Sequence, residues 1–183
     1  MHPPEIHASA RLLTRQETQI SPWVKVVAKE VQFTSRQFTE TYHCLKQADY
    51  VAILARTASG TIPIVRKYRP AVEAYTWELP SGLVDDDESP EGTCQRELRE
   101  ETGLIAEKVI PLGSVYPDTG RLENKLHAFF VECLEMPSNF VAEPGLDVEL
   151  VDIAKLKSMI RNGEFKHQLH LGVLLMAELK VPS

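Results

Sequence analysis

The stretch from Gly82 to Leu104 constrains the fold most, because it specifies a loop, one helix and a sharp stop in a fixed order. Ser89 and Pro90 are typical of the first positions of a helix, and Gly103 is typical of the residue after the last turn. The sequence therefore predicts a helix over residues 90–102 that follows an acidic loop.

Three carboxylates lie near the end of this predicted helix. Glu97, Glu100 and Glu101 are spaced i, i+3 and i+4, which places them on one face of the last turns. Like charges repel there, and the helix C-terminus disfavours each anion by about 0.3–1 kcal/mol. Glutamate is a good helix former, so a solvated charged face is the alternative. Three carboxylates placed against these local preferences indicate a functional site.

The complete pattern resembles the Nudix box, Gly-x5-Glu-x7-Arg-Glu-U-x-Glu-Glu-x-Gly-U, where U is a bulky apolar residue. Every defined position matches: Gly82, Glu88, Arg96, Glu97, Leu98, Glu100, Glu101, Gly103 and Leu104. The resemblance implies the Nudix α/β/α sandwich with a mixed sheet. It also implies metal-assisted hydrolysis of a phosphoanhydride.

The resemblance assigns metal ligands by position. Clustered carboxylates are hard oxygen ligands, suited to Mg²⁺, with Mn²⁺ second. Glu97 and Glu101 are the strongest candidates, Glu100 is a third, and the main-chain carbonyl of Ser81 or Gly82 completes the set.

The remaining box positions are expected to be structural. Arg96 pairs with Glu88 and holds the loop against the helix, while Gly82 and Gly103 supply a turn and a cap. Cys94 invites a nucleophile hypothesis, but a small buried side chain is the favoured interpretation.

The chain changes character near Ala48. Residues 22–45 alternate, which predicts a small antiparallel sheet in an N-terminal region, 1–47, for dimerisation or substrate contact. The Nudix hydrolase domain then spans 48–183. A small sheet is unstable alone and must pack on that domain or on a second subunit. Resemblance to pyrophosphatases with such a sheet predicts a homodimer.

The second region predicts strands alternating with helices. Ser59-Gly60 is a predicted turn that makes the first two strands neighbours. The predicted strands are 50–56, 62–68, 73–79, 108–116, 126–133 and 148–151, and the predicted later helices are 153–161 and 166–179. His167 and His170 are expected at the surface or as helix caps, and His127 in a strand.

The segments beside the box indicate a substrate class. The run from Arg66 to Asp85, and Trp23-Val-Lys-Val, resemble ADP-ribose and ADP-sugar pyrophosphatases. The resemblance implies that ADP-ribose or a related nucleoside diphosphate sugar is split into a nucleoside monophosphate and a sugar phosphate. Asp118-Thr119-Gly120 stands where that subfamily usually has Ser-Pro-Gly, so the sugar stays open.

Three side chains are candidate substrate contacts. Arg69 offers a planar fork for phosphate oxygens, with a surface ion pair as the alternative. Trp23 could stack on adenine, or it could be a core residue under the small sheet. Glu78 could meet the base or ribose, or form an ion pair within a strand.

The resemblance places the general base in the acidic segment after the box. Glu149 is the first candidate, followed by Asp147 and Glu143, and Glu100 is a catalytic candidate within the box. Ordinary loop charges are the alternative for the acidic segment.

Composition narrows the partners. A net charge of −6 over 183 residues argues against a general nucleic-acid or membrane-surface binder. Three widely spaced cysteines indicate neither a disulfide framework nor a zinc site. Residues 1–7 lack a signal pattern and no apolar run approaches about 18 residues, so a cytoplasmic protein is expected.

Two alternatives to a nucleotide-sugar hydrolase stay open. One is a Nudix hydrolase of a nucleoside triphosphate or dinucleotide, which the flanking segments disfavour. The other is a non-catalytic ADP-ribose sensor, which the complete box disfavours.

Overall fold

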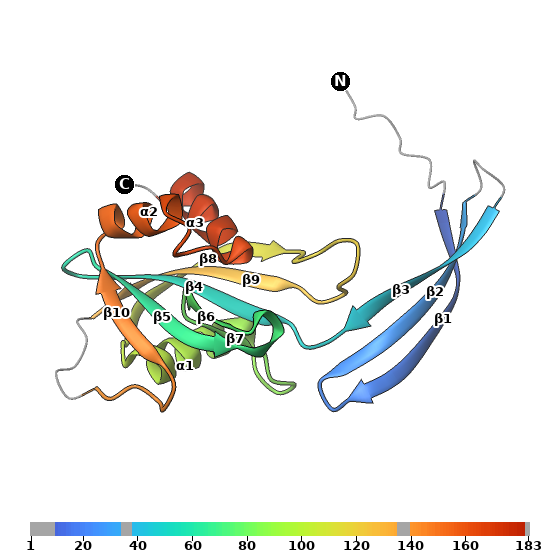
Figure 1. Ribbon diagram of the computed structural model, residues 1–183, viewed down its shortest axis with the longest axis horizontal. Coiled ribbons are helices and arrows are strands. Elements are labelled where there is room, and N and C mark those ends of the chain that lie inside the picture. Colours follow the sequence, from blue (N-terminus) through green and yellow to red (C-terminus); the bar gives the residue numbers. More distant parts are fainter. Residues whose placement is uncertain (1–9, 34–37, 135–139, 182–183) are drawn as a thin grey trace, which may run out of the picture. The chain divides into compact units, whose positions relative to one another are not determined.

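The computed structural model describes residues 10–33, 38–134 and 140–181, and it divides into two compact units (Figure 1). One unit comprises residues 1–47 with 116–124, and the other comprises 48–115 with 125–183. Residues 1–7, on which the expectation about a signal sequence rests, lie outside the described ranges.

The first unit is the small antiparallel sheet that the alternation predicts. Its strands are β1 (Ala10–Ser21), β2 (Val24–Phe33) and β3 (Phe38–Lys46), in the order β1-β2-β3. Strand β1 was not predicted, because nearly every residue in it is exposed and no apolar period marks it.

Residues 116–124 join this sheet as a loop. The Leu45 amide donates to the Arg121 carbonyl at 2.7 Å, and the Glu123 amide donates to the Leu45 carbonyl at 3.0 Å. The Glu123 carboxylate accepts two hydrogen bonds from the Arg15 guanidinium, at 2.7 and 2.8 Å, and also pairs with Lys29. Backbone hydrogen bonds and ion pairs therefore both hold this loop against the sheet.

The described residues of the second unit form two sheets and three α-helices. The order of the mixed sheet is β7-β4-β9-β8, and that of the antiparallel sheet is β10-β5-β6. The strands are β4 (Tyr50–Thr57), β5 (Ile62–Arg69), β6 (Ala74–Glu78), β7 (Ser81–Leu83), β8 (Ala106–Val115), β9 (Leu126–Cys133) and β10 (Asp147–Val151). The helices are η1 (Pro70–Val72), α1 (Pro90–Thr102), α2 (Ile153–Arg161) and α3 (Gln168–Lys180). Within the described ranges, no helix is long and apolar enough to cross a membrane.

The expected pairing of the first two strands of this unit is wrong. The turn after β4 forms, with the Thr57 amide donating to the Thr61 carbonyl at 2.9 Å. Strand β4 is already paired on both sides, by β7 and β9, so β5 continues into the other sheet. The sequence indicates a turn between two strands, but it does not show whether the edges of β4 are available to pair with β5.

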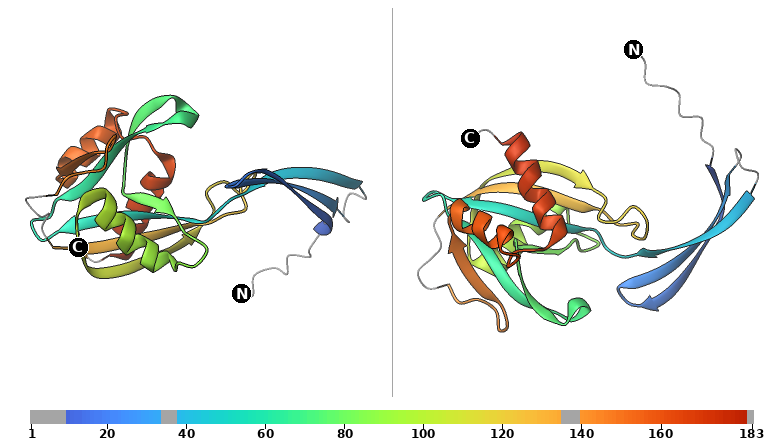
Figure 2. Two further views of the ribbon diagram at one scale, coloured as in Figure 1. Left: turned by 90° about the horizontal axis from the view of Figure 1, so that it is seen from below. Right: turned by 45° about the horizontal axis from the view of Figure 1, so that its top comes forward.

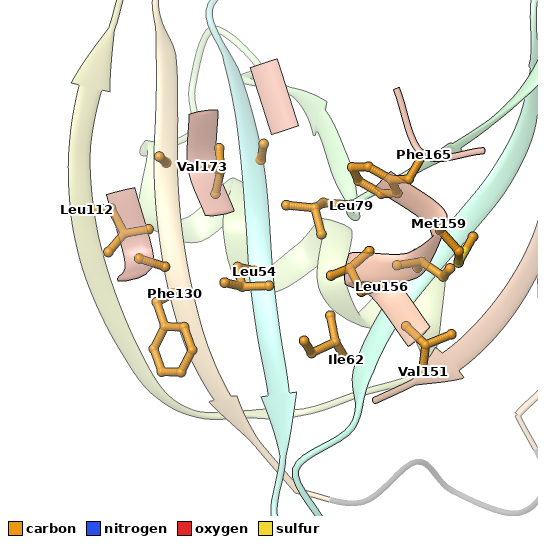
Figure 3. Packing of buried hydrophobic residues seen from close by; sticks show 14 of the residues in the cluster. Leu54, Ile62, Leu79, Leu112, Phe130, Val151, Leu156, Met159, Phe165 and Val173 are labelled. Atoms are coloured by element: carbon orange, nitrogen blue, oxygen red, sulfur yellow. The ribbon is translucent and has the colours of Figure 1, made fainter. Parts of the chain in front are cut away.

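Strand β4 is buried on both faces, which explains its continuous apolar run. Val51 and Ile53 pack in one cluster with Leu98 of α1, whereas Ala52 and Leu54 pack in another. That second cluster includes residues of α2 and α3, and Figure 3 shows Leu54, Leu156 and Val173 among its members. Helices therefore cover the sheet on both sides, as Figure 2 shows, and the predicted α/β/α layering is confirmed.

Helix α1 begins and ends where its capping residues predict. The Ser89 hydroxyl accepts from the Gly92 amide at 3.1 Å, and Gly103 has a φ of 70° with its amide bonded to the Arg99 carbonyl. Burial raises the pKa of the Cys94 thiol to about 12, so this side chain is an inert filler of the core, as expected.

Candidate active site

Glu101 is the most strongly held carboxylate of the box. It is buried, and its Oε2 accepts the Ser81 amide at 2.9 Å while its Oε1 accepts the Lys67 ammonium at 2.6 Å. Strands β5 and β7 thus both meet the last turn of α1 at this one side chain.

Gly82 allows the backbone of β7 to lie against Glu97. A Cβ atom on Gly82 would come within 1.9 Å of the Glu97 carboxyl carbon, so Glu97 can hold this position only beside a glycine. The main chain of Ser81 and Gly82 therefore lies beside both Glu97 and Glu101. This arrangement brings together the predicted carboxylate ligands and the segment expected to provide a carbonyl.

Arg96 joins the acidic loop to the helix. Its Nη2 donates to Glu88 at 3.0 Å, and its Nη1 donates to Glu97 at 2.7 Å and to Glu100 at 3.0 Å. The hydroxyl of Thr93 donates to Glu88 at 2.7 Å and fixes the loop further. Arg96 thus makes the expected pair with Glu88 and also balances two carboxylates of α1.

The carboxylates carry unequal desolvation costs. Burial raises the pKa of Glu97, and the Arg96 hydrogen bond offsets only part of that effect. Glu100, by contrast, leaves half of its side chain exposed. Burial therefore disfavours the ionised form of Glu97, and a nearby cation would stabilise that form.

The donor set fits a hard divalent cation. Glu97, Glu100 and Glu101 present carboxylate oxygens, and the β7 main chain adds carbonyl oxygens in the same region. Mg²⁺ and Mn²⁺ prefer oxygen ligands of this kind, whereas zinc prefers nitrogen and sulfur. The residues present therefore agree with the metal that the box implies.

Arg69 and Glu78 form an ion pair between β5 and β6. The guanidinium donates to the two carboxylate oxygens at 2.8 and 2.6 Å, and Thr76 donates at 2.5 Å. Burial alone would raise the pKa of Glu78, but these donors lower it to about 2. Because Glu78 has no exposed surface, its geometry matches the strand ion pair rather than a contact with base or ribose.

Two histidines of α3 lie beside Glu78, and the expectation that His170 is at the surface or a cap is wrong. His170 is 2% exposed, its Nδ1 accepts the Leu79 amide at 3.0 Å, and its ring stacks on His167 at 3.9 Å. The apolar period of α3 covered this position, which the prediction overlooked. His167 stands at the N-cap position but makes no capping hydrogen bond through its side chain.

Ligand atoms of Glu78, His167 and His170 lie within 4.8 Å of one another, but their chemistry does not suit a second metal. Arg69 already occupies both oxygens of Glu78. Because His170 Nδ1 accepts a hydrogen bond, the neutral ring carries its proton on Nε2, the atom that a metal would need. The cluster is therefore a packed polar network.

Buried His170 makes stability depend on pH. Burial lowers its pKa from 6.5 to about 3, so between these values the unfolded chain binds a proton that the folded chain does not. The free energy of unfolding must then fall as the pH drops from 6.5, by up to about 1.4 kcal/mol per pH unit. We expect His170→Gln to reduce this slope between about pH 6.5 and pH 5, measured by urea unfolding. His43→Gln on β3 is the control, and equal slopes in His170→Gln and wild type would contradict the prediction.

Two of the proposed bases, Asp147 and Glu149, lie on the opposite face of the sheet from Lys67, the residue of that sheet that contacts Glu101. Asp147 pairs with Arg66 across the β10–β5 ladder, and Glu149 lies two residues further on the same face. Adjacent residues of a strand point to opposite faces, so Lys67, which reaches Glu101, lies on the other side of this sheet. Glu149 and Asp147 are exposed there.

Glu143 lies in a segment anchored near the carboxylates. The Phe140 ring covers Gly103 at the end of α1, only 2.3 Å from where a Cβ would stand. Three residues of chain span at most about 11 Å, so Glu143 stays within reach of that helix end. Glu143 and Glu100 are therefore the candidate bases that the structure keeps near α1.

Trp23 lies in the turn between β1 and β2 and is 72% exposed. The alternative that it is a core residue under the small sheet is therefore wrong. Stacking on adenine stays a prediction, since Trp23 belongs to the first unit and the carboxylates belong to the second.

Comparison with known proteins agrees with this fold and box. The NUDIX domain model matches residues 45–169, which is more than half of the chain, so the chain belongs to the Nudix family. A solved structure described as an ADP compounds hydrolase shares the fold, with a TM-score of 0.75 at 18% identity over 93% of this chain and 92% of that one.

Sequence relatives include proteins named for the expected subfamily. An ADP-ribose pyrophosphatase of Bacillus subtilis is 36% identical over 92 residues, half of this chain and half of that protein. An ADP-ribose pyrophosphatase of Mycobacterium tuberculosis is 35% identical over 55% of this chain and 43% of its own length. A methanol dehydrogenase activator of Bacillus methanolicus is 31% identical over 73% of this chain and 70% of that protein. The chain thus spans about half the length of these two pyrophosphatases.

Proposed function

We propose that this protein hydrolyses the pyrophosphate bond of ADP-ribose or a related nucleoside diphosphate sugar with Mg²⁺, or with Mn²⁺ in its place. The observation that carries the proposal is the convergence of Glu97 and Glu101 with the β7 backbone inside a complete box. Products would be a nucleoside monophosphate and a sugar phosphate.

Glu97, Glu101 and Glu100 would hold the metal, together with a main-chain carbonyl of Ser81 or Gly82. The metal, when bound, neutralises diphosphate charge and activates water. The chain's own part is to fix these oxygens: Ser81 orients Glu101, and Arg96 orients Glu97 and Glu100. A small nucleotide sugar is the proposed partner. The free cysteines favour the cytoplasm as the compartment of the protein.

The substrate class rests on two kinds of support. The run from Arg66 to Asp85 resembles that subfamily, and relatives from Bacillus subtilis and Mycobacterium tuberculosis are named ADP-ribose pyrophosphatases. The name methanol dehydrogenase activator, carried by another relative, shows that proteins of similar sequence are known by other roles.

A substrate panel tests the proposal directly. Purified protein with Mg²⁺ is given ADP-ribose, ADP-glucose, UDP-glucose, GDP-mannose, NADH and dATP, and the products are separated by chromatography. We expect a diphosphate sugar to be cleaved fastest, with AMP or its analogue released. Preference for dATP would support a triphosphate hydrolase, and binding of ADP-ribose without turnover would support a sensor.

The general base is tested by matched glutamine variants. Because Glu149 lies on the sheet face opposite Lys67, we expect Glu149→Gln to keep activity within about threefold of wild type. We expect Glu100→Gln or Glu143→Gln to lose about 10²-fold or more, the usual contribution of a general base. The measurement is kcat for ADP-ribose at saturating Mg²⁺, and a loss of that size in Glu149→Gln would restore Glu149 as the base.

We also propose a homodimer formed through the first unit. Leu12, Ile20, Trp23 and Tyr42 are exposed on its strands and turn, and a second subunit packed on this sheet would bury that apolar surface. Sedimentation velocity at micromolar concentration should show a species of about twice 20.6 kDa. Only the single-chain mass at that concentration would contradict the dimer.

A further inference from the structure

Lys67 is a residue of this site that the box does not contain. It lies on β5, and its register partner Thr76 places it on the sheet face that also carries Arg69 and Glu78. Its side chain is 19% exposed and its ammonium lies 2.6 Å from Glu101 Oε1. This distance describes a direct, charge-assisted hydrogen bond.

The bond leaves Glu101 with both oxygens engaged. Oε2 accepts the Ser81 amide, and Oε1 accepts the Lys67 ammonium. A divalent cation that uses Oε1 meets a positive charge already on that oxygen. Ammonium and metal carry like charges, so they compete for Glu101 rather than share it.

Arg96 also donates to a proposed metal ligand, Glu97, but its own position is fixed by a different residue. It contacts Glu88, Glu97 and Glu100, and Glu88 in the acidic loop anchors it with three hydrogen bonds. Lys67 has Glu101 as its salt-bridge partner among the described residues. The position of the Lys67 ammonium therefore depends on Glu101, the same carboxylate that a metal ion would bind.

We propose that Lys67 is a built-in counter-ion of the metal site. It holds Glu101 in place when no metal is bound, and it must be displaced before a divalent cation can use Oε1. Lys67 thereby raises the divalent-ion concentration that activates the enzyme. The inference rests on the proposed function, because it takes Glu101 as a metal ligand.

Lys67→Gln tests this inference through metal affinity rather than through activity alone. Glutamine keeps a hydrogen-bond donor near Glu101 and removes the charge. We expect Mn²⁺, measured by calorimetric titration, to bind Lys67→Gln at least about fivefold more tightly than wild type. Lys108→Gln is the matched control, because it removes an equal charge from an exposed pair with Glu132 on the same unit. Its Mn²⁺ affinity should equal that of wild type.

Thermal melting supplies a second readout. Without metal, Lys67→Gln should melt at a lower temperature than wild type, because Glu101 is then buried without a cation. With Mg²⁺ added, the melting temperature should rise more in the variant than in wild type. A Lys67→Arg variant keeps the charge and should not bind Mn²⁺ more tightly than wild type, which keeps the inference testable if Lys67→Gln does not fold.

The outcomes separate the two proposals. Equal or weaker Mn²⁺ binding by Lys67→Gln, with binding abolished by Glu101→Gln, overturns the role of Lys67 and leaves the metal site standing. Tighter binding by Lys67→Arg also overturns it. Absence of Mn²⁺ binding in wild type overturns the metal assignment and, with it, this inference.

Discussion

Glu101→Gln is expected to lower turnover of ADP-ribose by about 10²–10³-fold or more, the loss seen when one charge-stabilising group is removed from an active site. Glu101 is buried at the last turn of α1 and binds both the β7 backbone and Lys67. Glutamine matches its shape and can still accept one hydrogen bond, but it is a poor ligand for a hard cation. The fold should therefore survive while the metal site fails.

The measurement is kcat with Mg²⁺ together with the far-UV circular dichroism spectrum of each protein. Glu107→Gln on β8 is the control, since it makes the same substitution at an exposed position. Unchanged magnesium-dependent turnover in Glu101→Gln would remove Glu101 from the metal ligands.

Gly82→Ala is expected to lower activity much more than stability. The added methyl would stand 1.9 Å from the Glu97 carboxyl carbon, so either β7 or Glu97 must move. The carboxylate is the far end of a flexible side chain, so moving it costs little stability. A shift of Glu97 of this size also misplaces a ligand, for which we expect about a 10²-fold loss of kcat.

Gly172→Ala provides the matched control, because nothing lies within 4 Å of its added Cβ and it stands inside α3. Alanine there should stabilise the protein by up to about 1 kcal/mol through helix propensity. Both variants are compared by urea unfolding and by ADP-ribose hydrolysis. Wild-type activity in Gly82→Ala would show that β7 yields without disturbing the carboxylates.

Local signals predicted the elements that local chemistry determines. Capping residues Ser89 and Gly103 defined α1, and the continuous apolar run of β4 indicated a strand covered on both faces. Strand β1 carries no such signal, because an exposed strand needs no apolar face. The partners of β4 are set by long-range pairing, which a turn signal alone does not reveal.

The carboxylate cluster followed from spacing within one helix, whereas its surroundings did not. Lys67 reaches Glu101 from β5, and His170 reaches the Leu79 amide from α3, and nothing beside either residue in the chain indicates these contacts. The placement of Glu149 was available, however. Val148 and Leu150 alternate with Asp147 and Glu149 along β10, so strand alternation places the two acidic residues together on one face.

The path of the chain also limits how this protein can be taken apart. It passes from the first unit to the second near residue 47, returns for 116–124, and leaves again. Deleting residues 1–47 would remove Leu45, Arg15 and Lys29, the partners that hold Arg121 and Glu123. The N-terminal strands are therefore not a separable module. A protein without them would keep the loop 116–124 but lose the residues that hold its conformation. Recombination that exchanged only residues 1–47 or only residues 116–124 would likewise separate each segment from its partners.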